Sequence, residues 1–255
     1  MSGDPGNLIV TGAAGGVGSA AVRQLVERGA HVMAVDLDES GLNRALDGIA
    51  GPGEVVMRAA DVGDEDAVRS YVEEAAERFG GLSGVFNIAG IEGDFAPSGE
   101  ATIENYDRCM RVNARSVFLN MRFAIPVLVA GGGGAIVNTG SHLAWHGAGT
   151  LGAYCASKHA VMGMTRAAAI EYAAHGIRVN CVCPSSVETA MAERVSAAIN
   201  PDQPELGKQV LIDQGFNERL ATADEVAGAG IWLLCDAPTH ITGILLPIDG
   251  GQAAA

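Results

Sequence analysis

Tyr154 and Lys158 stand four residues apart in the run GAYCASKHAVMG. If this run is helical, the phenol and the amine lie on one face and act on the same small volume. A nearby cation favours the phenolate and lowers a tyrosine pKa from its usual value near 10. Ser141 follows the apolar segment AIVNTG, where its hydroxyl could donate to an oxygen that develops charge. Together these residues predict a proton-transfer centre; taken singly, each also fits a solvated helix face or a turn.

A glycine cluster in the segment LIVTGAAGGVGSAA joins a predicted strand to a predicted helix. One register, Gly16, Gly18 and Ala21, puts its first glycine too far beyond the strand for a tight turn. The other register, Gly12, Gly16 and Gly18, puts Gly12 at the strand end and is preferred. These glycines would let the backbone approach a pyrophosphate held at the start of a helix near Val17.

Asp36 ends the next predicted strand, HVMAVD, and is followed by Leu37. An acid at this position of a dinucleotide-binding unit accepts hydrogen bonds from the adenosine ribose. Its charge would repel the extra phosphate of NADP, and the segment from Gly12 to Gly18 contains no Lys or Arg. The sequence therefore predicts NAD as cofactor, with a helix-capping role for Asp36 as the alternative.

Short β-branched segments alternate with amphipathic ones along the whole chain, which is typical of a parallel sheet built from βαβ units. Several strands, such as LIV and AIV, are continuously apolar, as expected when helices cover both faces. We expect an α/β fold: one domain, 1–255, with a doubly wound, seven-stranded parallel sheet. The predicted strands are NLIVTG, HVMAVD, EVVMRAAD, GVFNIAG, GAIVNTG, IRVNCVCP and GILLPID, and the predicted helices are 17–28, 39–47, 65–79, about 102–129, about 151–175 and about 224–235.

The pattern breaks at about 189–223, where a two-helix insertion is expected near the carboxyl edge of the sheet. We interpret it as a helical lobe that forms a lid on the substrate side, with a plain surface hairpin as the alternative. The loop SHLAWHGAGTLGAY carries Leu143, Trp145 and His146, which are expected to line a substrate pocket with Ser141 and Tyr154. An apolar pocket of this kind would suit a secondary alcohol or ketone.

The composition disfavours several classes of protein. The 255 residues carry a formal net charge of −14 without a run of Lys or Arg, which argues against a nucleic-acid or membrane partner. Five cysteines fit reduced thiols, and the pair Cys181 and Cys183 lacks neighbours for a metal site. The segment MSGDPGN lacks the basic and apolar parts of a signal peptide, so we expect no metal and a cytoplasmic location.

In combination, these motifs resemble the short-chain dehydrogenase/reductase family, a family of Rossmann-fold oxidoreductases, along nearly the whole chain. The glycine turn TGAAGGVG, the helix residue Asn113 in RVNARS, Ser141, and YCASK match family motifs. Further matches are the cofactor-contacting positions Asp61, Val62, Asn87, Ala89, Gly90, Pro184, Val187 and Thr189, and the closing turn 249–251. The chain departs from the family at Ile88, where a second Asn is common, and at Ser185, where Gly is common.

The resemblance implies an NAD-dependent oxidoreductase in which Tyr154 is the general acid/base and Ser141 steadies the substrate oxygen. It implies that Lys158 lowers the Tyr154 pKa and binds the nicotinamide ribose, and that Asn113 holds a water linking Lys158 to solvent. Many relatives are homotetramers, so a homotetramer is expected.

Two alternatives remain open from the sequence. Within the family, the protein could reduce 3-oxoacyl groups on a carrier protein or oxidise 3-hydroxyacyl thioesters, although its negative charge and Asp36 argue against this. From a different class, it could be a non-catalytic, NAD-binding regulatory protein, although it retains both Tyr154 and Lys158.

Overall fold

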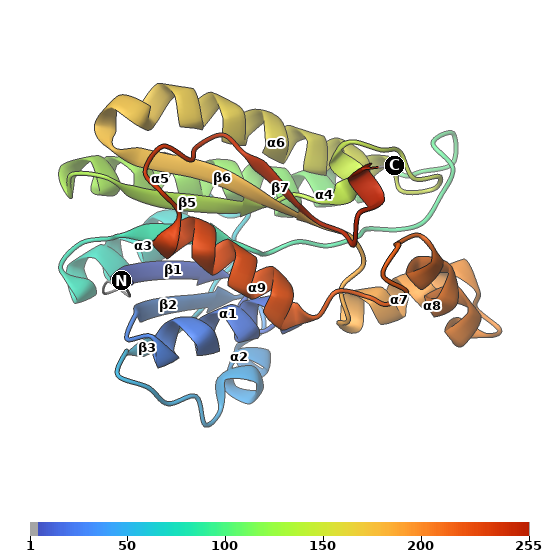
Figure 1. Cartoon of the computed structure of the whole chain (residues 1–255), viewed down its shortest axis with the longest axis horizontal. Coiled ribbons are helices and arrows are strands. Elements are labelled where there is room, and N and C mark those ends of the chain that lie inside the picture. Colours follow the sequence, from blue (N-terminus) through green and yellow to red (C-terminus); the bar gives the residue numbers. More distant parts are fainter. Residues whose placement is uncertain (1–4, 255) are drawn as a thin grey trace.

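A seven-stranded parallel sheet forms the centre of the protein in the computed structural model, which describes residues 5–254 (Figure 1). The remaining residues, including 1–4 of the segment used to argue against a signal peptide, lie outside the described residues. The strand order is β3-β2-β1-β4-β5-β6-β7, with all pairs parallel. This confirms the predicted single-domain, doubly wound fold. The strands are β1 (Asn7–Thr11), β2 (His31–Asp36), β3 (Val55–Ala59), β4 (Gly84–Asn87), β5 (Gly134–Thr139), β6 (Ile177–Pro184) and β7 (Leu245–Ile248).

Helices cover both faces of the sheet, which explains why its strands are continuously apolar. Because side chains alternate along a strand, Ile9 of β1 enters one core while Leu8 and Val10 enter the other. The first core is closed by α3 (Glu65–Phe79), α5 (Ser116–Ala130) and α6 (Gly152–Tyr172). The second is closed by α1 (Gly16–Glu27), α2 (Glu39–Leu46) and α9 (Ala223–Ile231).

Local sequence signals set several helix ends. Asp64 caps α3 by accepting a hydrogen bond from the amide of Ala67 at 2.8 Å, and Gly80 ends the helix in the left-handed conformation. Thr222 and Glu225 form a capping box at the start of α9. These caps explain why the sequence predicts the bounds of α3 and α9 to within one residue at their first turns.

The helical segment Ile103–Ala130 differs from a uniform α-helix. It consists of α4 (Ile103–Cys109), a π-helical segment (Met110–Arg115) and α5. By length and composition alone this segment could cross a membrane, but 56% of its apolar window is buried within the protein, where α5 packs on the sheet. Its apolar character is therefore accounted for by the core. A second π-helical segment, Trp232–Asp236, follows α9, and short 3₁₀ turns occupy His142–Ala144, Ala173–His175 and Gln252–Ala254.

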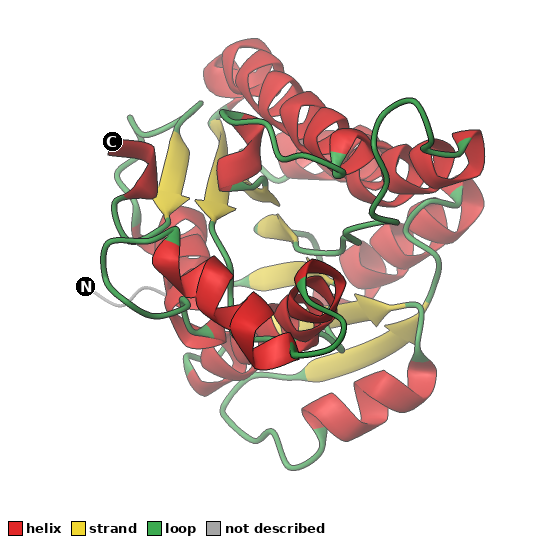
Figure 2. Cartoon of the chain, turned by 90° about the vertical axis from the view of Figure 1, so that its right-hand side faces the viewer, coloured by secondary structure: helices red, strands yellow, loops and turns green. Residues whose placement is uncertain are grey.

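Two further helices, α7 (Ala190–Ile199) and α8 (Pro204–Asp213), project from the body of the molecule (Figure 1). Figure 2 views the molecule from the side on which they project. They share a small core of their own, made by Ala192, Leu211 and Leu220 with Val195 and Ile212 packed against it. This α7–α8 segment is thus packed separately from the two large cores that hold the sheet.

Candidate active site

A cavity of about 1320 Å³ opens at the carboxyl ends of the strands and reaches from the glycine turn to the α7–α8 segment. It lies beside β1, which pairs with β2 on one side and β4 on the other. From β1 the chain first adds strands toward β3 and then, from β4 on, in the opposite direction toward β7. Ligands of doubly wound proteins bind at this switch point. Its volume exceeds that of common small-molecule pockets, so a dinucleotide and a small substrate fit together.

The turn between β1 and α1 is open to a pyrophosphate because its glycines leave no side chains there. Gly12 has a φ of +71°, and a Cβ at this position would lie 2.8 Å from the backbone of Ala89. A Cβ on Gly18 would lie 2.0 Å from the carbonyl oxygen of Gly12. Helix α1 begins at Gly16 with no capping side chain, which leaves its first amides available to an anion.

Asp36 is the last residue of β2, and its side chain forms hydrogen bonds with the glycine turn and with the loop that follows β2. Its Oδ2 accepts a hydrogen bond from the amide of Ala14 at 3.0 Å, and its Oδ1 accepts one from the amide of Asp38 at 3.2 Å. Leu37 beside it is 73% exposed and lines the same cavity. A carboxylate held in this way fits the hydroxyl groups of an adenosine ribose.

Asp61 and Val62, the residues matched to an adenine contact, line the same end of the cavity. The Asp61 carboxylate accepts a hydrogen bond from the guanidinium of Arg111 at 2.6 Å and one from the amide of Gly63 at 2.8 Å. These bonds to Arg111 and Gly63 outweigh burial, so the pKa of Asp61 is lowered. No pattern in the sequence indicates Arg111 at this position.

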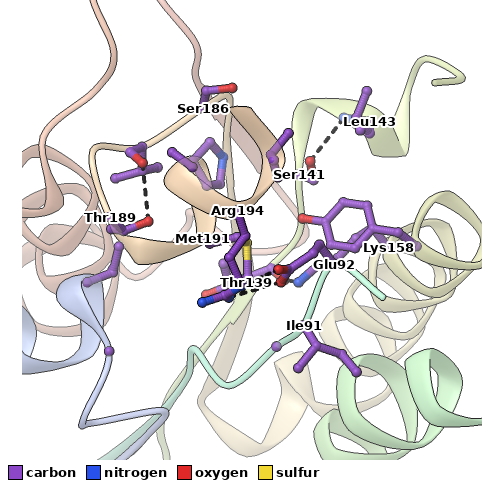
Figure 3. A pocket seen from close by; sticks show the side chains of 18 of the residues that line it. Ile91, Glu92, Thr139, Ser141, Leu143, Lys158, Ser186, Thr189, Met191 and Arg194 are labelled. Atoms are coloured by element: carbon purple, nitrogen blue, oxygen red, sulfur yellow. Dashed lines mark hydrogen bonds and ion pairs between the residues drawn. The ribbon is translucent and has the colours of Figure 1, made fainter. Parts of the chain in front are cut away.

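Tyr154 and Lys158 line the cavity from the first turns of α6, as their spacing predicts; Lys158 is labelled in Figure 3. The Lys158 Nζ lies 5.6 Å from the centroid of the Tyr154 ring and donates to the carbonyl of Thr139 at 2.8 Å. Lys158 is only 4% exposed. The ammonium group is thus held by the end of β5, underneath the reacting end of the cavity.

Burial decides the proton affinities of this pair. It raises the pKa of Tyr154 to about 12, against a smaller opposite effect of the hydrogen bond with Ser141. It lowers the pKa of Lys158 to about 8, although the thiols of Cys181 and Cys183 act in the other direction. The pKa of Tyr154 is therefore raised overall, because the loss of solvent around the phenol dominates. That Lys158 lowers this pKa relative to its value without the ammonium group stays a prediction.

Asn113 lies behind the pair in the π-helical segment and is almost completely buried. Its Nδ2 donates to the carbonyl of Ile91 at 2.8 Å and to Ser157 Oγ at 2.9 Å. Its Oδ1 accepts a hydrogen bond from the amide of Ile91 at 2.8 Å. A Cβ on Gly90 would lie 3.3 Å from Asn113 Oδ1 and 3.4 Å from Lys158 Nζ. The structure thus brings the side chains of Asn113 and Lys158 close to one glycine.

Ser141 follows β5 and caps the 3₁₀ turn His142–Ala144. Its Oγ accepts a hydrogen bond from the amide of Leu143 at 3.1 Å. Ser141 is buried, lines the cavity together with Tyr154, and acts to lower the Tyr154 pKa. A substrate oxygen in the cavity could therefore contact both hydroxyls.

The loop after Ser141 differs from its prediction at one residue. Leu143 and His146 line the cavity, but Trp145 does not and is 37% exposed. Trp145 directly follows the 3₁₀ turn His142–Ala144 and lies outside the cavity wall, although Leu143 and His146 on either side of it line the cavity. The sequence does not indicate this turn.

Asn87 is a second correction, because its side chain does not reach the cavity. It is buried within the sheet, where its Nδ2 donates to Asn138 at 2.9 Å. The neighbouring Ala89 and Gly90 do line the cavity, as do the predicted cofactor positions in the β6–α7 connection, Pro184, Val187 and Thr189.

Besides Asp38 and Arg111 at the adenosine end, sequence reasoning missed His142, Glu92 and Arg194 in the cavity wall. His142 Nδ1 lies 3.3 Å from the carbonyl oxygen of Pro184, and burial lowers its pKa. Arg194 of α7 forms a two-point ion pair with Glu92, a residue in the loop after β4. The two partners are separated by about a hundred residues, so no local pattern could have revealed them.

The fold and this site define a class, the dinucleotide-binding α/β oxidoreductases, with a serine, a tyrosine and a lysine at the reacting end of the cavity. Among residues 5–254 no cluster of His, Cys, Asp and Glu could hold a metal ion.

Comparisons with known proteins agree with this class. A family model described as enoyl-(acyl carrier protein) reductase matches residues 12–253. Levodione reductase of Leifsonia aquatica is 35% identical, with 97% of this chain and 94% of that protein covered, and its crystal structure superposes with a TM-score of 0.94. Cyclohexanol dehydrogenase of an Acinetobacter species is 33% identical, with 96% and 94% covered.

A solved structure of carveol dehydrogenase from Mycobacterium avium, in complex with NAD, is 26% identical, with 97% of each chain covered and a TM-score of 0.91. The chain belongs to the short-chain dehydrogenase/reductase family. It is an oxidoreductase that interconverts alcohol and carbonyl groups, and its cofactor is a nicotinamide dinucleotide.

Proposed function

We propose that the protein is an NAD-dependent dehydrogenase of ring-bearing secondary alcohols and the corresponding ketones. The observation that carries this proposal is that Ser141, Tyr154 and the buried Lys158 line one end of a large cavity together, with the Lys158 Nζ 5.6 Å from the Tyr154 ring centroid. When bound, NAD accepts or supplies the hydride.

Tyr154 takes the proton from the substrate hydroxyl during oxidation and returns it during reduction. Ser141 donates a hydrogen bond to the same oxygen and so stabilises the charge that develops on it. Lys158, in its cationic form, favours the phenolate and holds the nicotinamide ribose. Asn113 fixes the loop at Ile91, and the second lone pair of its Oδ1 is available to a water beside Lys158.

The preference for NAD over NADP rests on Asp36. Its carboxylate is fixed by two backbone amides at the end of β2, where a 2′-phosphate would approach a negative charge. Within the described residues that line the cavity, the lysine and arginine side chains are Arg111, Lys158 and Arg194. Arg111 is already paired with Asp61, which disfavours its use as a phosphate ligand.

The substrate class rests on the cavity wall and on the relatives. Leu143, Phe95, Met191 and Val195 give the outer part of the cavity an apolar wall, which suits a hydrocarbon ring. Cyclohexanol dehydrogenase carries such a ring alcohol in its name. We propose the α7–α8 segment as the lid of this pocket, because it contributes part of the wall and packs separately from the sheet.

We also propose that the enzyme works in the cytoplasm as a homotetramer. All five cysteines are free, which fits a reducing compartment. Apolar side chains are exposed on α4, α5 and α6, including Tyr106, Phe118 and Ile170, and such a surface fits contact between subunits. Light scattering after size-exclusion chromatography tests the tetramer, which a monomeric mass would contradict.

The activity is tested with the purified protein, NAD⁺ or NADP⁺, and a panel of cyclohexanols, open-chain secondary alcohols and 3-hydroxyacyl thioesters. We expect NAD⁺-dependent oxidation of the ring alcohols, and its loss by three or more orders of magnitude in Tyr154→Phe. Preferred turnover of the thioesters would support the carrier-linked alternative. No turnover with any substrate class, together with normal NAD binding, would support a regulatory protein.

A further inference from the structure

The ionisable side chains that line the cavity are unevenly distributed. Among the described residues, Asp36, Asp38, Asp61 and Arg111 surround the adenosine end, and Lys158 lies beneath the reacting centre. Beyond the reacting centre, the permanently charged side chains are Glu92 and Arg194 (Figure 3). The wall around them is mostly apolar, so this ion pair is the strongest polar feature that a substrate would meet there.

Glu92 is held in place by the active site itself. The preceding residue, Ile91, has both its amide and its carbonyl bound by the side chain of Asn113. The Glu92 side chain is 11% exposed, and its charge acts on Tyr154 in the direction that raises the tyrosine pKa. The carboxylate therefore lies close to the reacting centre and has little freedom to move away.

Arg194 approaches this carboxylate from α7, on the other side of the cavity. Its Nε donates to one carboxylate oxygen of Glu92 and its Nη2 donates to the other, at 3.1 Å for the second contact. The remaining nitrogen, Nη1, has no partner among the described residues, and the arginine side chain is 57% exposed. The ion pair is thus neutral as a whole, yet Arg194 Nη1 can still donate a hydrogen bond beside the Glu92 carboxylate, which can accept one.

We propose that the Glu92–Arg194 pair determines substrate specificity by binding a second, uncharged polar group, a hydroxyl or a ring carbonyl, that lies beyond the reacting carbon of a ring substrate. A second hydroxyl donates to the Glu92 carboxylate and accepts from Arg194 Nη1. A ring carbonyl accepts from Nη1 alone. An anionic group is disfavoured, because Glu92 already satisfies the arginine charge and repels a second anion.

This proposal rests on the proposed function, because it concerns a substrate oxidised at Tyr154. The test compares kcat/KM for cyclohexane-1,4-diol with kcat/KM for cyclohexanol, both with NAD⁺. We expect the wild type to prefer the diol by about tenfold or more, since a hydrogen bond to a charged group has this strength. The preference should appear mainly in KM, and 4-hydroxycyclohexanecarboxylate should be a poorer substrate than the diol.

Arg194→Met should lower the ratio of the two kcat/KM values, because it removes the Nη1 donor and leaves only the Glu92 carboxylate to bind the second hydroxyl. The double variant Glu92→Gln/Arg194→Met keeps the side-chain volumes, removes both charges of the pair, and should lower the ratio further, to about one. Arg78→Met is the matched control, because Arg78 also pairs with a glutamate, Glu54, far from the cavity. It should leave the ratio unchanged.

The outcomes separate the two proposals. If the wild type oxidises cyclohexanol and the diol equally well, or if both Arg194 variants keep the wild-type preference, the specificity role of the pair is wrong while the proposed function stands. If the wild type oxidises neither alcohol, the proposed function fails, and the specificity role fails with it.

Discussion

Replacing Lys158 by methionine tests how the buried charge controls Tyr154. The variant keeps much of the side-chain volume and removes the ammonium group that lies 5.6 Å from the tyrosine ring. Alcohol oxidation requires the phenolate, so kcat/KM should rise as the pH passes the tyrosine pKa. The cation favours the phenolate; without it, this rise must move to higher pH.

The magnitude follows from the geometry. For a charge separation of roughly the 5.6 Å between Lys158 Nζ and the tyrosine ring centroid, two unit charges interact by ~3 kcal/mol at an effective dielectric constant of ~20, which corresponds to roughly two pKa units. Lys158 carries its charge below its pKa of about 8, so its stabilisation of the phenolate is present near neutral pH.

The assay is the initial rate of NADH formation from a ring alcohol, measured from about pH 6 to about pH 11. We expect the acid limb of Lys158→Met to shift upward by about two pH units, with a rate roughly 100-fold lower near neutral pH. Arg166→Met is the control, because it removes a positive charge from the exposed side of the same helix, roughly 12 Å further along. An acid limb that stays in place in Lys158→Met would refute this electrostatic coupling.

Three further predictions concern the cofactor turn and the loop over the cavity. Asp36→Asn removes the repulsion between the carboxylate and the 2′-phosphate of NADP⁺, which is ~1–2 kcal/mol in this partly solvated position. The ratio of kcat/KM for NADP⁺ to kcat/KM for NAD⁺ should therefore rise about tenfold. An unchanged ratio would argue against Asp36 as the determinant of cofactor preference. Gly18→Ala places a Cβ 2.0 Å from the Gly12 carbonyl oxygen. Titration with NADH should show at least tenfold weaker binding, and thermal unfolding should show a free energy of unfolding lower by ~1–3 kcal/mol. Wild-type affinity would contradict this close packing of the turn. Trp145→Ala should change kcat/KM less than about twofold, because the side chain does not line the cavity, and a larger loss in steady-state assays would bring Trp145 back to the substrate.

The fold was predictable from the sequence because its signals are local. Strand β1 is apolar at the three successive positions Leu8 to Val10, and its neighbouring residues Ile9 and Val10 enter opposite cores. The glycine turn and Asp36 were predictable for a similar reason, since strand ends and helix starts set where they lie along the chain.

The features that were missed depend on contacts between distant segments or on irregular turns. Glu92 and Arg194 meet only because the β4 loop and α7 face each other across the cavity. The orientation of Trp145 depends on a single 3₁₀ turn, and the proton affinity of Tyr154 depends on burial. None of these has a periodic pattern that the sequence alone could display.

The separate packing of α7 and α8 has a consequence for how this enzyme can change over generations. Their small core, centred on Ala192, Leu211 and Leu220, shares no residue with the two large cores that secure the sheet. Substitutions in these helices should therefore have little effect on the free energy of unfolding of the rest of the protein. The α7–α8 segment and the cofactor-binding part of the sheet can accordingly change in sequence at different rates. Specificity for new alcohols can then evolve while the residues that bind the nucleotide stay the same.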